Sequence, residues 1–133
     1  MVKLYLDEDD SEVVHEAVEA AEGVANSTVA YAETRAAFVR RKRIGDLDDE
    51  GLQRAIRALD NDWRTYVRLA ASNLVAYRAG VLAERYALRG FDAIHLASAD
   101  RLEERFSDVY FLAFDPRLME AAREAAMRVY VGE

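Results

Sequence analysis

The sequence predicts an α/β fold in which helices flank a parallel sheet, and three observations lead to this prediction. Strand-like segments alternate with helical segments along the chain, as they do around parallel sheets. The apolar run at residues 109–114 has turn-forming residues on both sides, which is typical of a buried parallel strand. A length of 133 residues, 52% of them hydrophobic, suits one domain with its own core over residues 1–133.

The first half of the chain carries the signals of two strands and three helices. Ser11 and Asp48 precede helical runs and are suited to cap their N-termini. Gly23 and Gly45 follow helical runs and are suited to end them. The predicted strands are residues 2–6 and 24–28, and the predicted helices are residues 11–22, 29–43 and 48–67.

The second half continues the alternation. Gly90 follows a helical run, and the pairs Ser107-Asp108 and Asp115-Pro116 are turn signals on either side of an apolar run. The predicted helices are residues 72–89, 92–105 and 117–126, and the predicted strands are residues 109–114 and 128–131.

Composition restricts the class of protein. Twenty-five acidic residues against eighteen basic ones give a net charge of −7, which argues against broad electrostatic binding of nucleic acid. The chain has no cysteine and only two histidines, far apart in sequence, so any metal would be held by oxygen ligands. No apolar run approaches the length of a membrane span and no signal peptide is evident, which predicts a cytoplasmic protein.

Three acidic residues lie where apolar runs meet helices: Glu33, Asp92 and Asp115. Asp115 follows a predicted strand, at the edge of a parallel sheet where ligands bind. Asp92 lies in the first turn of its helix, where the helix dipole favours a carboxylate. Carboxylates that converge repel one another unless a hard cation such as Mg²⁺ or Mn²⁺ lies between them. The alternative is that each is an ordinary helix-terminal or solvated charge.

The segments around these acids resemble a known family. The runs RYALRGFDAIHLASADRL, FLAFDPRLMEAA and VAYAETRAAFVRR resemble the PIN-domain ribonucleases, in particular the VapC toxins of bacterial and archaeal toxin–antitoxin pairs. The resemblance extends over residues 2–131, and its most specific element is the string Asp-Ala-Ile-His-Leu-Ala at residues 92–97.

The resemblance implies an α/β/α sandwich around a parallel sheet, with four acidic positions that hold Mg²⁺ or Mn²⁺. Glu33 matches the second acid of the family, Asp92 the third and Asp115 the fourth. It further implies an endoribonuclease with RNA as its substrate, a cognate antitoxin protein as its inhibitor, and a homodimer.

The first acid of the family has no direct match. Family members begin with a strand that runs into Asp-Thr-Ser-Ala-Leu, whereas this chain starts where the following helix does. One interpretation is therefore an N-terminally shortened domain in which residues 2–6 belong to that helix. In the other, residues 2–6 replace the strand and Asp7, or one of the three acids after it, serves as a surrogate ligand. A functional alternative is an impaired or inactive PIN-like domain that acts as a binding or dimerisation module.

Basic and hydroxyl side chains near Glu33 are candidates for RNA contacts. The basic run at the end of the same predicted helix consists of Arg40, Arg41, Lys42 and Arg43, and Ser27 and Thr28 precede that helix. The alternative is that these cations only complement the dipole at the C-terminus of the helix.

Overall fold

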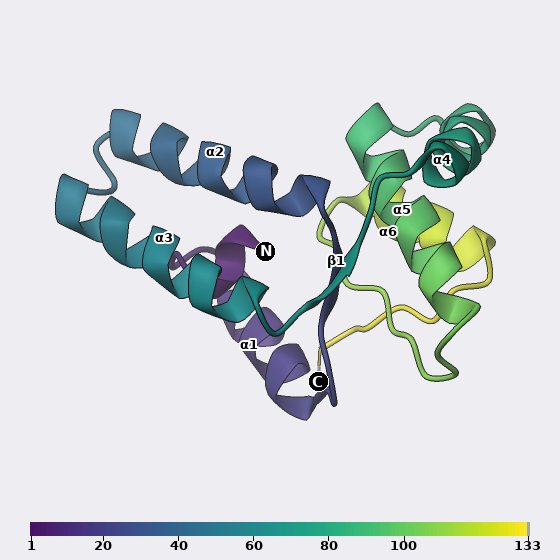
Figure 1. Cartoon of the computed structure of the whole chain (residues 1–133), viewed down its shortest axis with the longest axis horizontal. Helices are drawn as coiled ribbons and strands as arrows, with labels where there is room; N and C mark the ends of the chain where they lie inside the picture. The colour runs from purple at the N-terminus through teal and green to yellow at the C-terminus, as the bar shows by residue number, and fades with distance from the viewer. Residues whose placement is uncertain (133) are drawn as a thin grey trace. The chain divides into compact units, whose positions relative to one another are not determined.

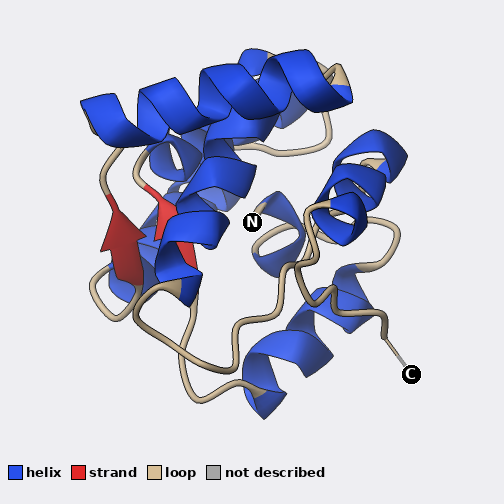
Figure 2. Cartoon of the chain, turned by 90° about the vertical axis from the view of Figure 1, so that its right-hand side faces the viewer, coloured by secondary structure: helices blue, strands red, loops and turns tan. Residues whose placement is uncertain are grey.

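The computed structural model describes residues 1–132, which divide into two compact units, Met1–Val67 and the part of the chain from Arg68 onward. The described chain has six α-helices and a parallel two-stranded sheet, so the predicted α/β class is confirmed (Figure 2). No helix in residues 1–132 is both long enough and apolar enough to cross a membrane.

The first unit begins with a short 3-10 helix, η1 (Val2–Leu4), and continues through four further elements. Helices α2 and α3 pack side by side, and β1 leads directly into α2 (Figure 1). The predicted bounds of α2 and the N-cap at Asp48 are confirmed, since the Asp48 carboxylate accepts a hydrogen bond from the Gly51 N–H at 2.6 Å. The elements are α1 (Ser11–Ala20), β1 (Ala25–Ser27), α2 (Val29–Arg43) and α3 (Asp49–Trp63).

The predicted strand at residues 2–6 is wrong, because the segment forms η1 and a turn instead. Leu6 is buried with Phe38, and Val2 and Tyr5 pack against the same apolar cluster. Positions 2, 5 and 6 share one face of a helical turn, whereas a strand would place 5 and 6 on opposite faces. Burial on one side therefore favours the helical conformation. The idea that residues 2–6 replace a sheet strand is wrong as well, whereas a ligand role of Asp7 stays a prediction.

The third predicted helix ends earlier than expected. Its C-terminus is closed by Thr65, whose N–H and hydroxyl both donate to the Asp62 carbonyl, at 2.8 and 2.7 Å. The chain then becomes extended, and Val67 opens β2 (Val67–Leu69), where its N–H donates to the Val24 carbonyl at 2.9 Å. The helical spacing of apolar residues through Val67 concealed this change, because a three-residue strand is too short to produce a periodicity of its own.

The second unit is built on α4 (Asn73–Tyr86), α5 (Gly90–Glu103) and α6 (Pro116–Glu124). Helices α4 and α5 make the most extensive contact, and their buried faces join that of α6 in one apolar cluster. Leu96 of α5 is fully buried at its centre. The cluster holds the first turn of α5, which carries Asp92, and the first turn of α6, which follows the N-cap residue Asp115.

Two predicted strands in the second unit are reduced to one bridge. Phe111 pairs with Val129 in parallel, through the bonds from the Phe111 N–H to the Arg128 carbonyl and from the Tyr130 N–H to the Phe111 carbonyl. The predictions for residues 109–114 and 128–131 are therefore wrong in extent. A strand needs a ladder of such bonds along its length, and these two bonds form a single bridge. Tyr110 beside the bridge is exposed, whereas a buried strand was predicted.

Candidate active site

Asp115 lies at the N-cap of α6, immediately before Pro116. Its Oδ1 atom accepts hydrogen bonds from the backbone N–H groups of Arg117 and Leu118, at 2.8 and 3.1 Å. Its Oδ2 atom accepts no hydrogen bond from the residues that the structure describes, and the side chain is exposed. The carboxylate is thus held in place by one oxygen while the other faces solvent.

Asp92 is the third residue of α5, after the N-cap Arg89. It is half-buried, and the neighbouring Ala93 is fully buried in the core. The unpaired N–H groups and the dipole of the first helical turn stabilise a negative charge at this position. The helix therefore fixes a carboxylate at the surface of the second unit.

Glu33 belongs to the second turn of α2 in the first unit and is half-buried. It lies within electrostatic reach of the Met1 amino group. Burial lowers the pKa of that amino group from its ordinary value of 8.0, and the negative charges of Glu8 and Glu33 act in the opposite direction. Glu33 thus shares its surroundings with a cationic group.

Within residues 1–132, no three acidic or histidine side chains lie together as the ligands of a metal ion would. Glu33 belongs to the first unit, and Asp92 and Asp115 belong to the second. All three supply carboxylate oxygens, which are the donors that Mg²⁺ and Mn²⁺ prefer. The donor chemistry fits such an ion, and the role of these residues stays a prediction.

Asp7 lies in the exposed turn between η1 and α1. The next residue, Glu8, already forms an ion pair, because its Oε1 atom lies 2.6 Å from the Arg41 guanidinium. Of these two acids, Asp7 is the better placed to take part in a site.

In the basic run at the end of α2, two side chains form ion pairs with acidic residues and two do not. Arg41 pairs with Glu8 and with Asp46, and Lys42 pairs with Asp49. Arg40 and Arg43 are exposed and form no ion pair within the described part of the chain. Within this basic run, Arg40 and Arg43 are therefore the two side chains whose charge no described acid compensates.

Ser27 and Thr28 differ in exposure. Ser27, the last residue of β1, is buried, and its Oγ atom accepts a hydrogen bond from the Val29 N–H at 3.4 Å. Thr28 is the exposed N-cap residue of α2 and makes no capping bond with its side chain. Ser27 therefore shapes the start of α2, and Thr28 is the hydroxyl that a ligand could reach.

A buried tyrosine pair in the first unit was not evident from the sequence. The hydroxyls of Tyr5 and Tyr66 lie 3.1 Å apart, and the Tyr5 hydroxyl donates to the Asp62 carboxylate at 3.0 Å. Burial raises the pKa of both tyrosines above the ordinary value of 10.0, and the hydrogen bond between the two hydroxyls raises the pKa of Tyr5 further. Folding therefore favours the neutral phenols, and their stabilising contribution is lost as pH rises above that value.

Two substitutions at Asp115 are expected to separate its structural role from its charge. Asp115→Ala removes the acceptor for two backbone N–H groups and should lower the free energy of unfolding by about 1 kcal/mol. Asp115→Asn keeps an oxygen at the cap and should cost clearly less, although it removes the negative charge. Urea denaturation of both variants measures this difference. Equal losses would show that the negative charge of Asp115, and not the acceptor oxygen alone, provides the stabilisation, and no loss in Asp115→Ala would show that the cap contributes nothing.

Comparison with known proteins places the chain in a family. It is 33% identical over 128 residues to Ribonuclease VapC45 of Mycobacterium tuberculosis strain CDC 1551 / Oshkosh, and equally to Ribonuclease VapC49 of strain ATCC 25618 / H37Rv. The aligned region covers 96% of this chain and 88% of each relative. No family model matches the sequence. Identity of this extent over nearly the whole chain shows common descent, and the chain belongs to the VapC family of PIN-domain ribonucleases, as the resemblance predicted.

Proposed function

We propose that this chain is a metal-dependent endoribonuclease that hydrolyses RNA phosphodiesters as the toxin of a toxin–antitoxin pair. The observation that carries the proposal is its 33% identity to two ribonucleases over an aligned region that covers 96% of its length. The acids at Glu33, Asp92 and Asp115 give that relationship a chemical basis, because each presents a carboxylate at or near the start of a helix.

Glu33, Asp92 and Asp115 would hold Mg²⁺ or Mn²⁺, and Asp7 is a candidate for the remaining acidic ligand. When bound, such an ion supplies a Lewis acid that neutralises phosphate charge and makes a coordinated water more acidic. The chain's own contribution is to position the carboxylates. The two backbone bonds to Oδ1 of Asp115 fix its orientation and leave Oδ2 available. The first turn of α5 stabilises Asp92 as an anion.

RNA binding is expected to use the unpaired cations of α2. Arg40 and Arg43 are exposed at the C-terminal end of this helix, whereas Arg41 and Lys42 are largely neutralised by acids. Contacts of guanidinium groups with phosphates give affinity without sequence specificity. The exposed Thr28 hydroxyl at the start of α2 could add a hydrogen bond to phosphate, and the buried Ser27 would act only through the backbone that it holds.

The test of the proposal is cleavage of a labelled RNA by the purified chain in Mg²⁺, in Mn²⁺ and in excess EDTA. We expect cleavage with either metal, loss of cleavage in EDTA, and recovery when Mn²⁺ is restored, because the carboxylates alone do not activate water. Cleavage that persists in EDTA would contradict the metal requirement. A folded chain that binds RNA without cutting it would favour the binding-module alternative.

An antitoxin protein is the expected partner. An acidic site of this kind is complementary to a basic side chain, so an inhibitory segment would place an arginine or lysine near the carboxylates. Co-expression with the product of the adjacent gene tests the expectation, and failure of the two proteins to co-purify would count against it. A second copy of the chain is the other expected partner.

A further inference from the structure

Two exposed phenylalanines lie directly before the two candidate metal ligands of the second unit. Phe91 precedes Asp92 and is 58% exposed. Phe114 precedes Asp115 and is 39% exposed. Neighbouring Cα atoms are only about 3.8 Å apart, so each ring is attached beside a carboxylate whichever rotamer it adopts. A group held by either acid therefore has an aromatic ring within reach.

The core of the second unit keeps the first of these rings at the surface. Ala93 is fully buried, in the same apolar cluster as Leu118 of α6. Phe91 lies two residues before Ala93, which is more than half of a helical turn of about 3.6 residues, so it projects from the opposite side of α5. Burial of Ala93 therefore directs the Phe91 ring towards solvent. Leu118 anchors the first turn of α6, which follows Phe114, to the same cluster.

A single exposed phenylalanine is common at protein surfaces, so its position decides its meaning. The exposed phenylalanines in residues 1–132 are Phe91, Phe106 and Phe114, and the first and last of these precede the acids. Aromatic rings gain most from partners with flat apolar faces, and every nucleobase has such a face. The two rings therefore have the chemistry of a stacking surface for bases.

Two arginines lie close to the rings in sequence. Arg89 lies two residues before Phe91, and its side chain is exposed. Arg117 lies three residues after Phe114 and is exposed as well. Neither arginine forms an ion pair within the part of the chain that the structure describes. A guanidinium group binds phosphate by charge and by hydrogen bonds, so each ring has both a carboxylate and a phosphate-binding cation within three residues.

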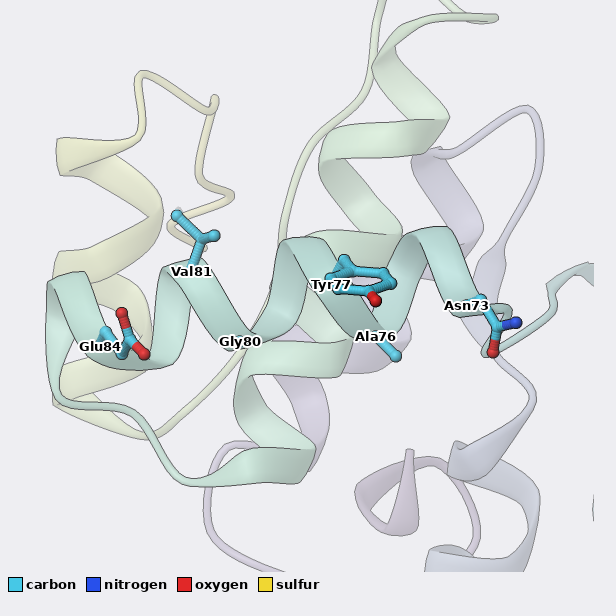
Figure 3. A pocket seen from close by; sticks show the side chains of 6 residues that line it. All are labelled: Asn73, Ala76, Tyr77, Gly80, Val81 and Glu84. Atoms are coloured by element: carbon cyan, nitrogen blue, oxygen red, sulfur yellow. The ribbon is translucent and has the colours of Figure 1, made fainter.

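The most exposed aromatic ring of residues 1–132 has different surroundings. Tyr77 is 80% exposed on α4, where it borders a hollow of about 410 Å³ (Figure 3). The charged residue among those that line this hollow is Glu84, which repels phosphate. Exposure alone therefore does not make a nucleotide site, and the combination of ring, acid and arginine distinguishes Phe91 and Phe114.

The arrangement suits a single unpaired strand of RNA. In a nucleotide the base is joined to its phosphate through the sugar, so a phosphate at the acids places the flanking bases to either side of it. Bases inside a double helix are stacked on one another and present no free face. The net charge of −7 repels RNA, whereas stacking supplies affinity that does not depend on charge.

We propose that Phe91 and Phe114 are substrate-binding residues that stack on unpaired bases next to the cleaved phosphate, and that they restrict the chain to single-stranded RNA. The inference rests on the proposed function, because it takes Asp92 and Asp115 as ligands of the metal ion. It adds the class of substrate and the side chains that recognise it.

Fluorescence of a short single-stranded RNA that contains 2-aminopurine tests the proposal. The titration is made at low salt in excess EDTA, so that binding is measured without cleavage. Stacking on a side chain changes the emission of 2-aminopurine, and we expect the wild-type chain to produce this change. The same RNA annealed to its complement should bind about tenfold more weakly or worse, because its bases have no free face.

Loss of either ring should weaken binding. Phe91→Ala and Phe114→Ala should each raise the dissociation constant about tenfold and reduce the change in emission, because stacking contributes this much per base. Phe91→Trp should bind at least as well as the wild type. Phe91→Leu should behave as Phe91→Ala does, because leucine keeps the apolar bulk without an aromatic face.

Phe106→Ala is the matched control. Phe106 is 51% exposed, lies beyond the C-terminal end of α5 and is not adjacent to a candidate ligand. This variant should bind RNA as the wild type does. Equal binding by Phe91→Leu and Phe91→Trp, or equal binding of single-stranded and double-stranded RNA, would overturn the proposal. Unchanged RNA binding by alanine variants that no longer co-purify with the antitoxin would also overturn it, and would assign the rings to a protein partner.

Cleavage kinetics in Mn²⁺ separate this inference from the proposed function. Phe91→Ala and Phe114→Ala should raise KM for single-stranded RNA about tenfold with little change in kcat, because stacking binds the substrate and the transition state alike. Alanine variants that cleave with the wild-type KM would overturn the inference and leave the nuclease intact. A wild-type chain that stacks on RNA without cutting it would contradict the nuclease and retain the two rings as RNA-binding residues.

Discussion

Replacing Asp92 with asparagine is expected to reduce metal-dependent RNA cleavage by about 100-fold or more. The substitution keeps the size of the side chain and removes one negative charge from the proposed ligand set. A reduction of this size corresponds to about 3 kcal/mol of transition-state stabilisation, which is within what a catalytic metal supplies. Initial rates of cleavage of a labelled RNA, measured over a series of Mn²⁺ concentrations, provide the test. If asparagine only weakens metal binding, high Mn²⁺ should restore part of the rate.

Asp100→Asn is the matched control, because Asp100 lies on the same helix and its carboxylate pairs with Arg78 at 2.9 Å. This partly exposed ion pair should contribute less than about 1 kcal/mol to stability, and its loss should leave cleavage unchanged. Both variants should unfold close to the wild-type urea midpoint. Full activity in Asp92→Asn would remove Asp92 from the site, whereas equal loss in both variants would point to a general effect on α5.

The helices were predictable from sequence because their end signals are local. Asp48 and Ser72 cap α3 and α4 with their own side chains, and the bounds of α2 agree with the prediction at both ends. Capping bonds join residues two or three positions apart, so they can be recognised without knowledge of the tertiary fold. The same holds for Asp115, whose position before Pro116 is a local signal for the start of a helix.

The strands were less predictable because a strand depends on partners that are distant in sequence. Residues 109–114 have the composition of a buried strand, but their ladder amounts to the single bridge at Phe111. Val67 enters β2 through a bond to Val24, more than forty positions earlier. Residues 2–6 alternate in polarity by coincidence, since packing of Leu6 against Phe38 sets their conformation. Periodicity alone does not contain this information.

The candidate site shows the same difference between features that depend on local sequence and features that depend on distant contacts. Glu33, Asp92 and Asp115 could be identified from sequence, because each lies near the start of a helix. Which side chains of the basic run form ion pairs could not be predicted, since the pairing of Arg41 with Glu8 depends on how α2 packs in the first unit.

Phe38→Ala is expected to lower the free energy of unfolding by about 3–5 kcal/mol. Phe38 is fully buried between α2 and α3, in one cluster with Leu59, and its ring meets that of Tyr5 edge to face at 5.9 Å. Truncation removes these contacts and leaves a cavity that the paired helices close only in part. Urea unfolding followed by the fluorescence of the single tryptophan, Trp63 at the end of α3, measures the loss in the unit where it occurs.

Val39→Ala is the control for this substitution, because Val39 is the next residue of the same helix and is 37% exposed. It removes less buried surface and replaces a β-branched residue with the best helix former, so its net effect should stay below about 1 kcal/mol. The comparison tests whether the first unit depends on the contact of η1, α2 and α3 around Phe38. Similar losses of unfolding free energy in the two variants would show that Phe38 contributes no more to stability than its partly exposed neighbour Val39.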